Sequence, residues 1–477
     1  MRRVEERELK LDVDPGWELP DLPGEPLEPR LVTSTYYDTA ARTLALAGIT
    51  VRRRVENGHS LWQLKVPRGK SRLELEAPGG PKGPPKAFSQ LLLGLTRRRP
   101  LQESATLRTR RTGIRVNADG AGVADVLLDA VDVLDGRRVR ESFAEVEIEL
   151  QRGDGRILGK LGRRLRRLGA RRGPGKPKLF RVLGLDSEPG SPPADAEPAE
   201  HLRSLVARQY AAILAHDPGT RLGDDPEDLH QLRVATRRLR AILRAARPLV
   251  EETWAASLRA ELKWLGGLLG PVRDLDVIVA QLKGERDTLD SAEREEATRL
   301  LDLLVADREH ARSELLAGLR SKRYLALLDT IEAAAAGLPL VTADETLDDI
   351  AGREFRKLRK AMDALPVTPS DAELHRARVK GKRARYAAEL AAAPGGRKAE
   401  RFVSRAKRFQ DVVGEHQDAV VAEERLRALL AERARGAHTA FAAGRLVERQ
   451  RARRRVAREN LPEAWRKLER AGRRAFS

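Results

Sequence analysis

Two patterns of hydrophobic and polar positions divide the chain near residue 185. Before it, short runs alternate apolar and polar residues and are separated by Gly, Pro, Asn and Asp, as in "RELKLDV", "ITVRRRV" and "SFAEVEIEL". Alternation with a period of two is typical of strands joined by turns. After it, long stretches of Ala, Leu, Arg and Glu favour helices. The pattern therefore predicts an α+β protein, with an antiparallel β-rich domain followed by an all-helical domain.

The boundary between the two patterns has the composition of a linker. The segment "DSEPGSPPADAEPAE" concentrates Pro, Ser, Gly and acidic residues, which disfavours both helices and strands. We predict an N-terminal domain over residues 1–184, a linker over residues 185–199 and a helical domain over residues 200–477.

The helical domain contains an internal repeat. The pattern H-x-x-R-V-x-x-(R/K)-R-x-R begins at His230 and again at His375, an offset of 145 residues. Downstream, "LLGPVRDLDVIV" is matched by "VVGEHQDAVVAE" at an offset of 144 residues, counted from Asp274 to Asp418. Two motifs at nearly the same offset indicate duplication. We predict two tandem helical bundles, over about residues 200–340 and 341–477.

Each copy of the repeat predicts a helix with a row of cations on one side. At about 100° per residue, the first copy gathers six basic or histidine residues within one stripe, opposite apolar Leu232, Ala235, Leu239, Ile242 and Leu243. The stripe consists of His230, Arg233, Arg237, Arg240, Arg244 and Arg247, and the second copy presents His375, Arg378, Lys382 and Arg385 before Glu389. Like charges at this spacing repel, and a bound anion would relieve the repulsion. The alternatives are a solvated face or a set of intramolecular ion pairs.

Composition narrows the identity of such an anion. Lys and Arg total 91 against 71 Asp and Glu, a formal net charge of +20, which favours nucleic acid, polyphosphate or an acidic membrane surface as a partner. Aromatic residues make up only 4% of the chain. Because nucleic acid binding commonly uses aromatic stacking, a bare phosphate chain is favoured over nucleic acid, which stays open as an alternative.

Two further features of composition exclude classes of chemistry and location. The chain has no cysteine, which excludes disulfide frameworks, thiolate metal sites and cysteine nucleophiles. It also has no apolar run of about 18 residues and no apolar signal-peptide region near residue 1. We therefore predict a cytoplasmic protein without a membrane span.

The N-terminal domain carries charged residues at strand spacing. Alternation places Glu6, Glu8 and Lys10 on one face of their strand, Arg52 beside Arg54 on another, and Glu145, Glu147 and Glu149 on a third. If these faces line one cavity, the carboxylates can hold a divalent cation while the cations hold phosphoryl oxygens. The alternative is that alternating charge marks the solvent face of a sheet.

The helical half resembles the CHAD domain, the conserved-histidine α-helical domain. The segments "DLHQLRVATRRLRAILR", "LLGPVRDLDV", "LHRARVKGKRARYAAEL" and "VVGEHQDAVV" occur in the family's order. The resemblance implies two four-helix bundles and a basic surface or groove that binds inorganic polyphosphate, so that the protein would associate with polyphosphate granules. The implied binding residues are His230, Arg233, Arg237, Arg240, Arg273, His375, Arg378, Lys382, Arg385 and His416. Gln417 stands where the first copy has Arg273, so the two halves need not bind equally.

The N-terminal half resembles the CYTH superfamily of triphosphate tunnel metalloenzymes. The E-x-E-x-K signature is met by Glu6, Glu8 and Lys10, and "YYDTAARTLALAGITVRRR", "WQLKVP", "RLELE" and "EVEIEL" follow in the family's order. The resemblance implies an eight-stranded antiparallel β-tunnel that binds a linear triphosphate. The implied phosphate ligands are Lys10, Arg52, Arg54, Lys65, Arg111 and Lys178, and the implied metal ligands or water-orienting residues are Glu6, Glu8, Asp129, Glu145 and Glu147. Arg110 competes with Arg111, because the parity of "TLRTRRTGIRV" is uncertain.

Together, the two resemblances imply an enzyme. We expect hydrolysis of inorganic triphosphate or related triphosphates that depends on Mg²⁺ or Mn²⁺, with inorganic polyphosphate bound by the helical domain. Acidic residues among the cations favour catalysis, since a pure anion binder gains nothing from them. The alternatives are a non-catalytic polyphosphate-binding or targeting protein and a class IV-type adenylate cyclase.

Overall fold

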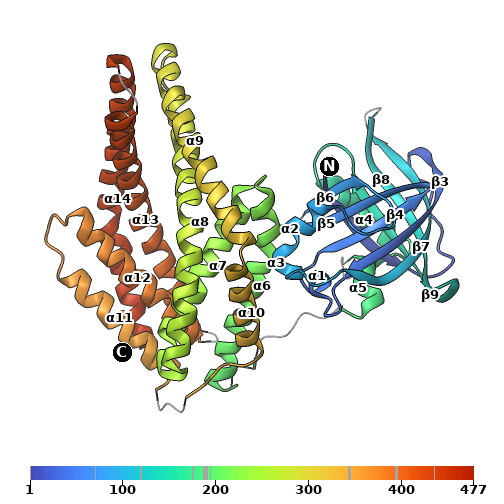
Figure 1. The fold of residues 1–477 in the computed structure, drawn as a ribbon, viewed down its shortest axis with the longest axis horizontal. Helices are drawn as coiled ribbons and strands as arrows, with labels where there is room; N and C mark the ends of the chain where they lie inside the picture. Colours follow the sequence, from blue (N-terminus) through green and yellow to red (C-terminus); the bar gives the residue numbers. More distant parts are fainter. Residues whose placement is uncertain are drawn as a thin grey trace. The chain divides into compact units, whose positions relative to one another are not determined.

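The chain forms two compact units, residues 1–190 with 217–222 and residues 191–216 with 223–477. Strands occur in the first unit and long helices in the second (Figure 1), which confirms the predicted α+β class with two domains. The computed structural model describes residues 2–69, 71–118, 121–173, 177–185, 192–193, 195–341, 345–392, 396–433 and 436–476. Across these residues, no helix combines the length and the apolar character that a membrane crossing requires.

The first unit is built on one antiparallel sheet of ten strands, in the order β1-β6-β5-β4-β3-β7-β8-β9-β2-β10. The strands are β1 (Arg2–Glu6), β2 (Glu8–Val13), β3 (Gly24–Asp38), β4 (Thr50–Glu56), β5 (His59–Arg68), β6 (Ser71–Pro78), β7 (Gln102–Ala118), β8 (Ala121–Asp135), β9 (Arg138–Leu150) and β10 (Arg171–Arg172).

The predicted eight-stranded count was therefore wrong, and the pairing explains why. The first predicted strand is split at Arg7: β1 pairs with β6 at one side of the sheet, whereas β2 pairs with β9 at the other. The tenth strand, β10, adds only two residues, paired with Leu11 and Asp12. Only Arg7 separates β1 from β2 in the chain, although the two strands lie near opposite ends of the strand order of the sheet.

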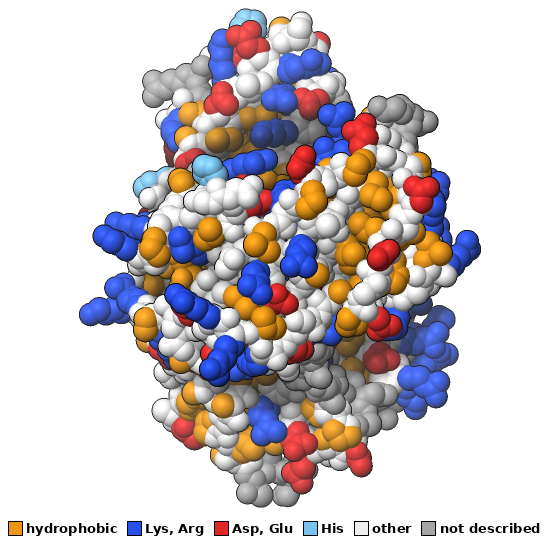
Figure 2. Space-filling view, turned by 90° about the vertical axis from the view of Figure 1, so that its right-hand side faces the viewer, with side chains coloured by type: hydrophobic (Ala, Val, Ile, Leu, Met, Phe, Trp, Pro, Cys, Tyr) orange, Lys and Arg blue, Asp and Glu red, His pale blue; other side chains and the backbone are white. Residues whose placement is uncertain are grey.

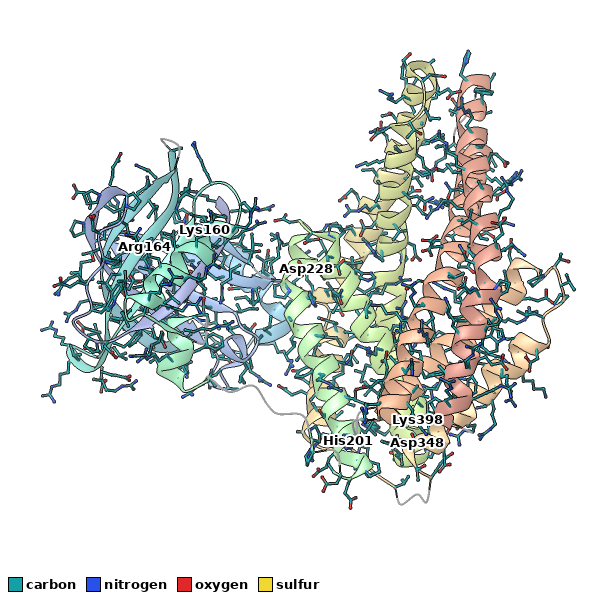
Figure 3. All side chains as sticks on the ribbon, turned by 180° about the vertical axis from the view of Figure 1, so that it is seen from behind. Lys160, Arg164, His201, Asp228, Asp348 and Lys398 are labelled. Atoms are coloured by element: carbon teal, nitrogen blue, oxygen red, sulfur yellow. The ribbon has the colours of Figure 1, made fainter. Side chains whose placement is uncertain are left out.

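The apolar core of the first unit lies on the outer face of the sheet. Helix α4 (Arg156–Arg167) buries Leu161 and Leu165 against Leu11, Val146 and neighbouring strand residues. Its outward side carries exposed Lys160 and Arg164 (Figure 3). Since side chains alternate across a strand, burying the apolar positions outside turns the charged positions of the same strands inward.

A second apolar cluster fixes the helix that reaches the inner face. Leu179 and Phe180 of α5 (Lys178–Leu183) pack with Tyr36, Leu107 and Phe143. This packing sets the position of Lys178, the first residue of α5. The other short helices are α1 (Thr43–Leu46), α2 (Lys86–Leu91) and α3 (Leu93–Thr96).

The second unit is helical. It contains α6 (Pro198–Leu222, of which the last six residues belong to the first unit), α7 (Pro226–Ala245), the 3₁₀ helix η1 (Arg247–Leu249), α8 (Glu252–Arg286), α9 (Ser291–Arg320), α10 (Lys322–Ala336), α11 (Leu347–Asp363), α12 (Asp371–Ala392), α13 (Arg397–Glu432) and α14 (Ala437–Phe476). Helices α12, α13 and α14 begin 145, 145 and 146 residues after α7, α8 and α9, respectively. The internal repeat of the sequence is therefore also a repeat of helices.

The rows of cations that begin at His230 and at His375 are called the first and second ladder below, and α7, which carries the first, has the predicted orientation. All five residues predicted for its apolar back are buried, namely Leu232, Ala235, Leu239, Ile242 and Leu243. Helix α6 begins at Pro198, two residues inside the predicted linker, a difference typical of helix ends. Residues 186–191 and 194 of that linker, and residues 342–344 at the predicted junction of the two halves, lie outside the described residues.

Candidate functional site

The inner face of the sheet surrounds a charged cavity of about 240 Å³. Strands β1 to β9 and the start of α5 all contribute side chains to it. Nine of the eleven residues that the sequence predicts for this site line the cavity: Glu6, Glu8, Lys10, Arg52, Arg54, Lys65, Arg111, Glu147 and Lys178. Strands far apart in the sequence thus bring the predicted cations and carboxylates to one place.

One wall of the cavity, formed by β4, β5 and β6, is rich in cations. Arg52 donates from Nε to Gln63 Oε1 at 2.7 Å, and Lys65 Nζ lies 2.5 Å from Glu6 Oε2 and 2.8 Å from Glu74 Oε2. The buried Nε atoms of Arg54 and Arg72 have no hydrogen-bond partner within the described part of the chain. Buried donors without acceptors are costly, so these two guanidiniums are suited to an anion that enters the cavity.

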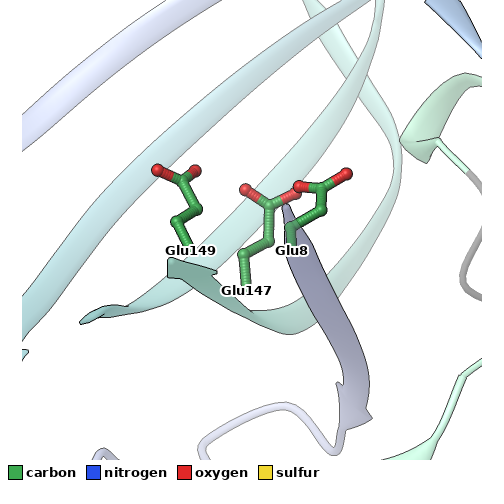
Figure 4. Close-up of side chains that lie close together, drawn as sticks. All are labelled: Glu8, Glu147 and Glu149. Atoms are coloured by element: carbon green, nitrogen blue, oxygen red, sulfur yellow. The ribbon is translucent and has the colours of Figure 1, made fainter. Parts of the chain in front are cut away.

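A second wall of the cavity, formed by β2 and β9, is acidic. Glu8 and Glu149 occupy paired positions on β2 and β9, and Lys10 is paired with Glu147 on the same two strands. One carboxylate oxygen from each of Glu8, Glu147 and Glu149 lies within 4.8 Å of the others, and all three residues line the cavity (Figure 4). Oxygen atoms gathered in this way are the ligands that Mg²⁺ and Mn²⁺ prefer. The set fits a divalent cation.

Proton affinities in the acidic wall are shifted by its crowding. Burial, followed by the negative charge of Glu147, raises the pKa of Glu149 to about 7. Burial opposes the charged form of Lys10, but the charges of Glu147 and Glu8 prevail and hold the pKa of this lysine above its usual range. Lys10 therefore stays an ammonium between two carboxylates, whereas Glu149 is close to balance between its two forms at neutral pH.

A second acidic group holds an ammonium of the chain itself. Asp129, Glu145 and Glu147 form a buried set, and Lys178 Nζ lies 2.8, 2.6 and 2.8 Å from their respective oxygens. Burial disfavours the charge on Lys178, but the three carboxylates raise its pKa well above the ordinary value. Asp129 and Glu145, the two predicted residues that do not line the cavity, thus hold Lys178, which does.

The register of β7 decides between its two adjacent arginines. Arg111 faces the cavity, directly across from Asp129 on β8, and its guanidinium donates to both oxygens of that carboxylate at 2.7 Å. Arg110 points the other way and is exposed. Arg111 is therefore the residue of this pair that belongs to the cavity.

Other cavity residues were not predicted as site residues. Tyr36, Gln63, Arg72 and Glu74 line the cavity, and so does Glu149, which strand parity had grouped with Glu145 and Glu147 but which was not among the predicted metal ligands. Arg72 and Glu74 lie at alternate positions of "SRLELEA", as the predicted charged residues do within their own strands. The spacing of this segment was therefore a signal that could have found them.

The helical unit has a basic groove where its two halves meet. Five of the ten predicted residues line it, Arg237, Arg240, His375, Arg378 and Lys382. Helix α7 starts at an Asp225 cap followed by Pro226, and α12 starts with reciprocal hydrogen bonds between Ser370 and Glu373. These caps set both ladders in the same phase, with a histidine at the fifth residue of each helix. We call the groove between α7, α8 and α12 the ladder groove.

Cations crowd one another in the ladder groove. Burial, followed by the charges of Arg378, Arg237 and Arg233, lowers the pKa of Lys382 to about 7. The buried Nε of Arg378 has no hydrogen-bond partner among the described residues. Arg259 and Lys263 of α8 also line the groove. The sequence pattern gave no reason to add them to the ladders, because α8 lies outside the repeated basic motif.

The other five predicted residues of the helical unit lie outside the lining of the groove. Arg233 pairs with Asp274 at 3.0 Å, and Arg385 lies over the ring of Tyr386 and 3.4 Å from Glu389. His416 is buried, with its Nε2 3.2 Å from Asp371 Oδ1. Burial and then the charge of Arg273 lower the pKa of His230, which indicates that these two residues lie near each other. His230, Arg233 and Arg385 thus belong to the two ladders without lining the groove, whereas Arg273 and His416 lie outside both ladders and groove.

The geometry of both units agrees with what comparison with known proteins shows. Residues 5–177 match the CYTH domain family and residues 204–427 match the CHAD domain family. The chain therefore belongs to the family of proteins in which a CYTH domain is followed by a CHAD domain, as the motifs predicted. An uncharacterized protein of Mycobacterium tuberculosis (strain H37Rv) is 30% identical over 475 residues, which cover 93% of this chain and 90% of the relative.

Solved structures resemble parts of the chain. The CHAD domain from the plant Ricinus communis is 25% identical, covers 61% of this chain and 96% of its own, and superposes with a TM-score of 0.48. A Hippeastrum protein with a dominant triphosphatase activity is 19% identical and covers 39% of this chain and 98% of its own, with a TM-score of 0.25.

Proposed function

We propose that the cavity of the first unit hydrolyses inorganic triphosphate or a related triphosphate with the help of Mg²⁺ or Mn²⁺. The observation that carries this proposal is the division of one cavity into two walls. Three carboxylates suited to a cation share the cavity with Arg54 and Arg72, whose buried Nε atoms have no partner among the described residues. A site that only bound anions would be weakened by carboxylates, so their presence favours catalysis.

Glu8, Glu147 and Glu149 would hold the cation. A bound Mg²⁺ or Mn²⁺ would polarise phosphoryl oxygens and make a bound water more acidic. The set formed by Asp129, Glu145 and Glu147 is less suited to a metal that meets the substrate, because all three carboxylates hold the Lys178 ammonium and neither Asp129 nor Glu145 lines the cavity. We assign Asp129 and Glu145 to the support of Lys178.

The residues of the chain itself supply the rest. Arg52, Arg54 and Arg72 line the basic wall and would bind phosphoryl oxygens through charge-assisted hydrogen bonds, which also align the phosphate chain. Lys10 and Lys178 present ammonium groups beside the carboxylates and would neutralise charge that develops on the leaving phosphate. No protein nucleophile is needed, because water can be the attacking group.

The test is phosphate release from tripolyphosphate by the full chain under Mg²⁺ or Mn²⁺, with Glu8→Gln as the variant. We expect loss of at least ~100-fold in turnover with the fold preserved, a size typical of groups that act in the transition state. Glu103→Gln, an exposed glutamate on β7, is the matched control and should keep full activity. Unchanged turnover in Glu8→Gln would refute the assignment.

For the second unit we propose binding of inorganic polyphosphate in the ladder groove. The supporting observation is the crowding of cations there, with an unpartnered donor on Arg378 and a lysine whose proton is weakly held. Negative charge in the groove would relieve both. Binding of polyphosphate should weaken steeply with salt and should be reduced in Arg237→Gln, whereas exposed Arg408→Gln on α13 should bind as the wild type does.

A further inference from the structure

A second basic groove occurs in the helical unit, where α13 begins and α14 ends. It has a volume of about 470 Å³ and shares no residue with the ladder groove. We call it the C-terminal groove. It is lined by Lys398, Arg401, Arg405, Lys467, Arg470, Ala471 and Arg474. Lys398 lies at the start of α13 (Figure 3).

The six cations of the C-terminal groove form two facing rows. On α13 they are spaced by three and then four residues, from Lys398 to Arg405, and on α14 the spacing from Lys467 to Arg474 is the same. Residues at this spacing lie on one face of a helix, and successive ones rise by about 5 Å. The two helices pack along each other and are separated in the chain by only residues 433–436. The two rows therefore lie on neighbouring helices and line the same groove.

Five of these six cations lack an acidic partner within the described part of the chain, unlike similar residues elsewhere on the same helices. Among the described residues, Lys467 is the one member of the six with an ion pair, to Glu463 on its own helix. Farther along the same helix, Arg454 pairs with Glu423 at 3.2 Å and with Asp371 at 3.0 Å. The helix pair therefore compensates its arginines at one place and leaves them uncompensated at the C-terminal groove, at a cost in repulsion.

We propose that the C-terminal groove is a second binding site for a linear inorganic phosphate chain. The proposal rests on the proposed function of the second unit, because it assigns the same polymer to a second surface. Among the described residues no carboxylate lines the groove, and its one lining residue without a charge, Ala471, has a small side chain that leaves room for a ligand. Two rows of guanidinium and ammonium donors match a ligand that carries anionic oxygens on every side and along its length.

The lining also favours a phosphate chain over nucleic acid. Every side chain that lines the groove is Lys, Arg or Ala, with no aromatic ring on which a base could stack. A long phosphate chain held by both grooves would dissociate more slowly than one held by either, because release from one site leaves the other engaged. A short chain would occupy the two grooves independently.

The experiment compares double variants of the full chain that remove two positive charges each. Arg401→Gln with Arg470→Gln changes the C-terminal groove. Arg408→Gln with Arg466→Gln removes the same charge from exposed positions of the same helices outside the groove. Arg237→Gln with Arg378→Gln changes the ladder groove. Each is titrated with a short phosphate chain, a long one and a single-stranded RNA, and thermal unfolding checks the fold.

We expect the wild type and the Arg408/Arg466 control to bind two short chains, and each groove variant to bind one. We also expect the Arg401/Arg470 variant to bind the long chain about tenfold more weakly, with a shallower salt dependence. Its unfolding temperature should equal or exceed that of the wild type, because repulsion is removed. A titration identical to that of the control overturns the proposal, as does a loss confined to RNA.

The outcomes separate this inference from the function on which it rests. Loss of one short-chain site in the Arg401/Arg470 variant, with none lost in the Arg237/Arg378 variant, supports the C-terminal groove and refutes the ladder groove. The reverse result supports the ladder groove and refutes the C-terminal groove.

Discussion

Replacement of Lys382 by methionine should stabilise the helical unit and weaken polyphosphate binding at the same time. Burial and three neighbouring guanidiniums lower the pKa of this lysine from 10.5 to about 7. The shift corresponds to roughly 5 kcal/mol if taken in full. Because the side chain is only partly buried, solvent screening reduces this figure, and we expect Lys382→Met to raise the free energy of unfolding by about 2 kcal/mol at pH 6.

The sign of the pH dependence follows from the two pKa values. Below pH 7 the lysine is charged in both the folded and unfolded chain, so the full cost of burying the charge is present. Between pH 7 and 10.5 the unfolded chain holds a proton that the folded chain has lost. Stability of the wild type therefore rises with pH across this range, and the advantage of Lys382→Met shrinks to nothing by its upper end.

Binding should show the opposite trend. Phosphate oxygens in the ladder groove favour the ammonium form of Lys382, so binding above pH 7 takes up a proton and weakens as pH rises. Calorimetry in buffers of different ionisation enthalpy measures this uptake, and thermal unfolding at pH 6 and 9 measures stability. Arg240→Met is the control. Because arginine stays charged at both pH values, its replacement should weaken binding equally at both. The reasoning would be contradicted if Lys382→Met were less stable than the wild type at pH 6. It would also be contradicted if polyphosphate binding by this variant still took up the proton.

Three further predictions concern the first unit. Lys178→Met leaves three buried carboxylates without their ammonium and should lower the free energy of unfolding by about 3 kcal/mol at neutral pH, measured by urea denaturation. Added Mg²⁺ should restore part of this loss. An unchanged free energy of unfolding would mean that the acids are not held by Lys178. Glu149→Gln should raise the Mg²⁺ concentration for half-maximal phosphate release at least ~10-fold, and an unchanged Mg²⁺ requirement would remove Glu149 from the cation site. Leu165 has 0% of its surface exposed, and Leu165→Ala should lower the free energy of unfolding by about 3 kcal/mol. Leu168 is 47% exposed, and Leu168→Ala should lower it by under ~0.5 kcal/mol. Similar losses for the two variants would refute the packing of α4.

The sequence predicted the cavity well where strand parity is uninterrupted. In "FAEVEIEL" the alternation of Glu145, Glu147 and Glu149 with apolar residues holds throughout, and the structure places their carboxylates on the inner side. Parity fails as a guide where the register shifts, as it does between Val116 and Asn117 on β7 and between Val133 and Leu134 on β8. A bulge turns the following side chains to the other face, and its position depends on the partner strand.

The same distinction applies to the helical unit. The two ladders could be predicted because helical spacing within one segment fixes which residues share a face. The contribution of Arg259 and Lys263 to the ladder groove could not be predicted, because it depends on how α8 packs beside α7. The C-terminal groove is a stronger case, since its two rows lie more than sixty positions apart in the chain and join only when α14 folds back along α13.

The two kinds of anion site differ in how their cations are satisfied. In the cavity of the first unit, Lys10, Lys65 and Lys178 are each already paired with carboxylates, so a phosphate chain must compete with acids of the protein. A divalent cation held by Glu8, Glu147 and Glu149 would neutralise those acids and release their cations toward phosphate. Metal and triphosphate should therefore strengthen each other's binding by the same factor. The two helical grooves contain few such acids, so they should bind phosphate chains without a metal, as a capture surface requires.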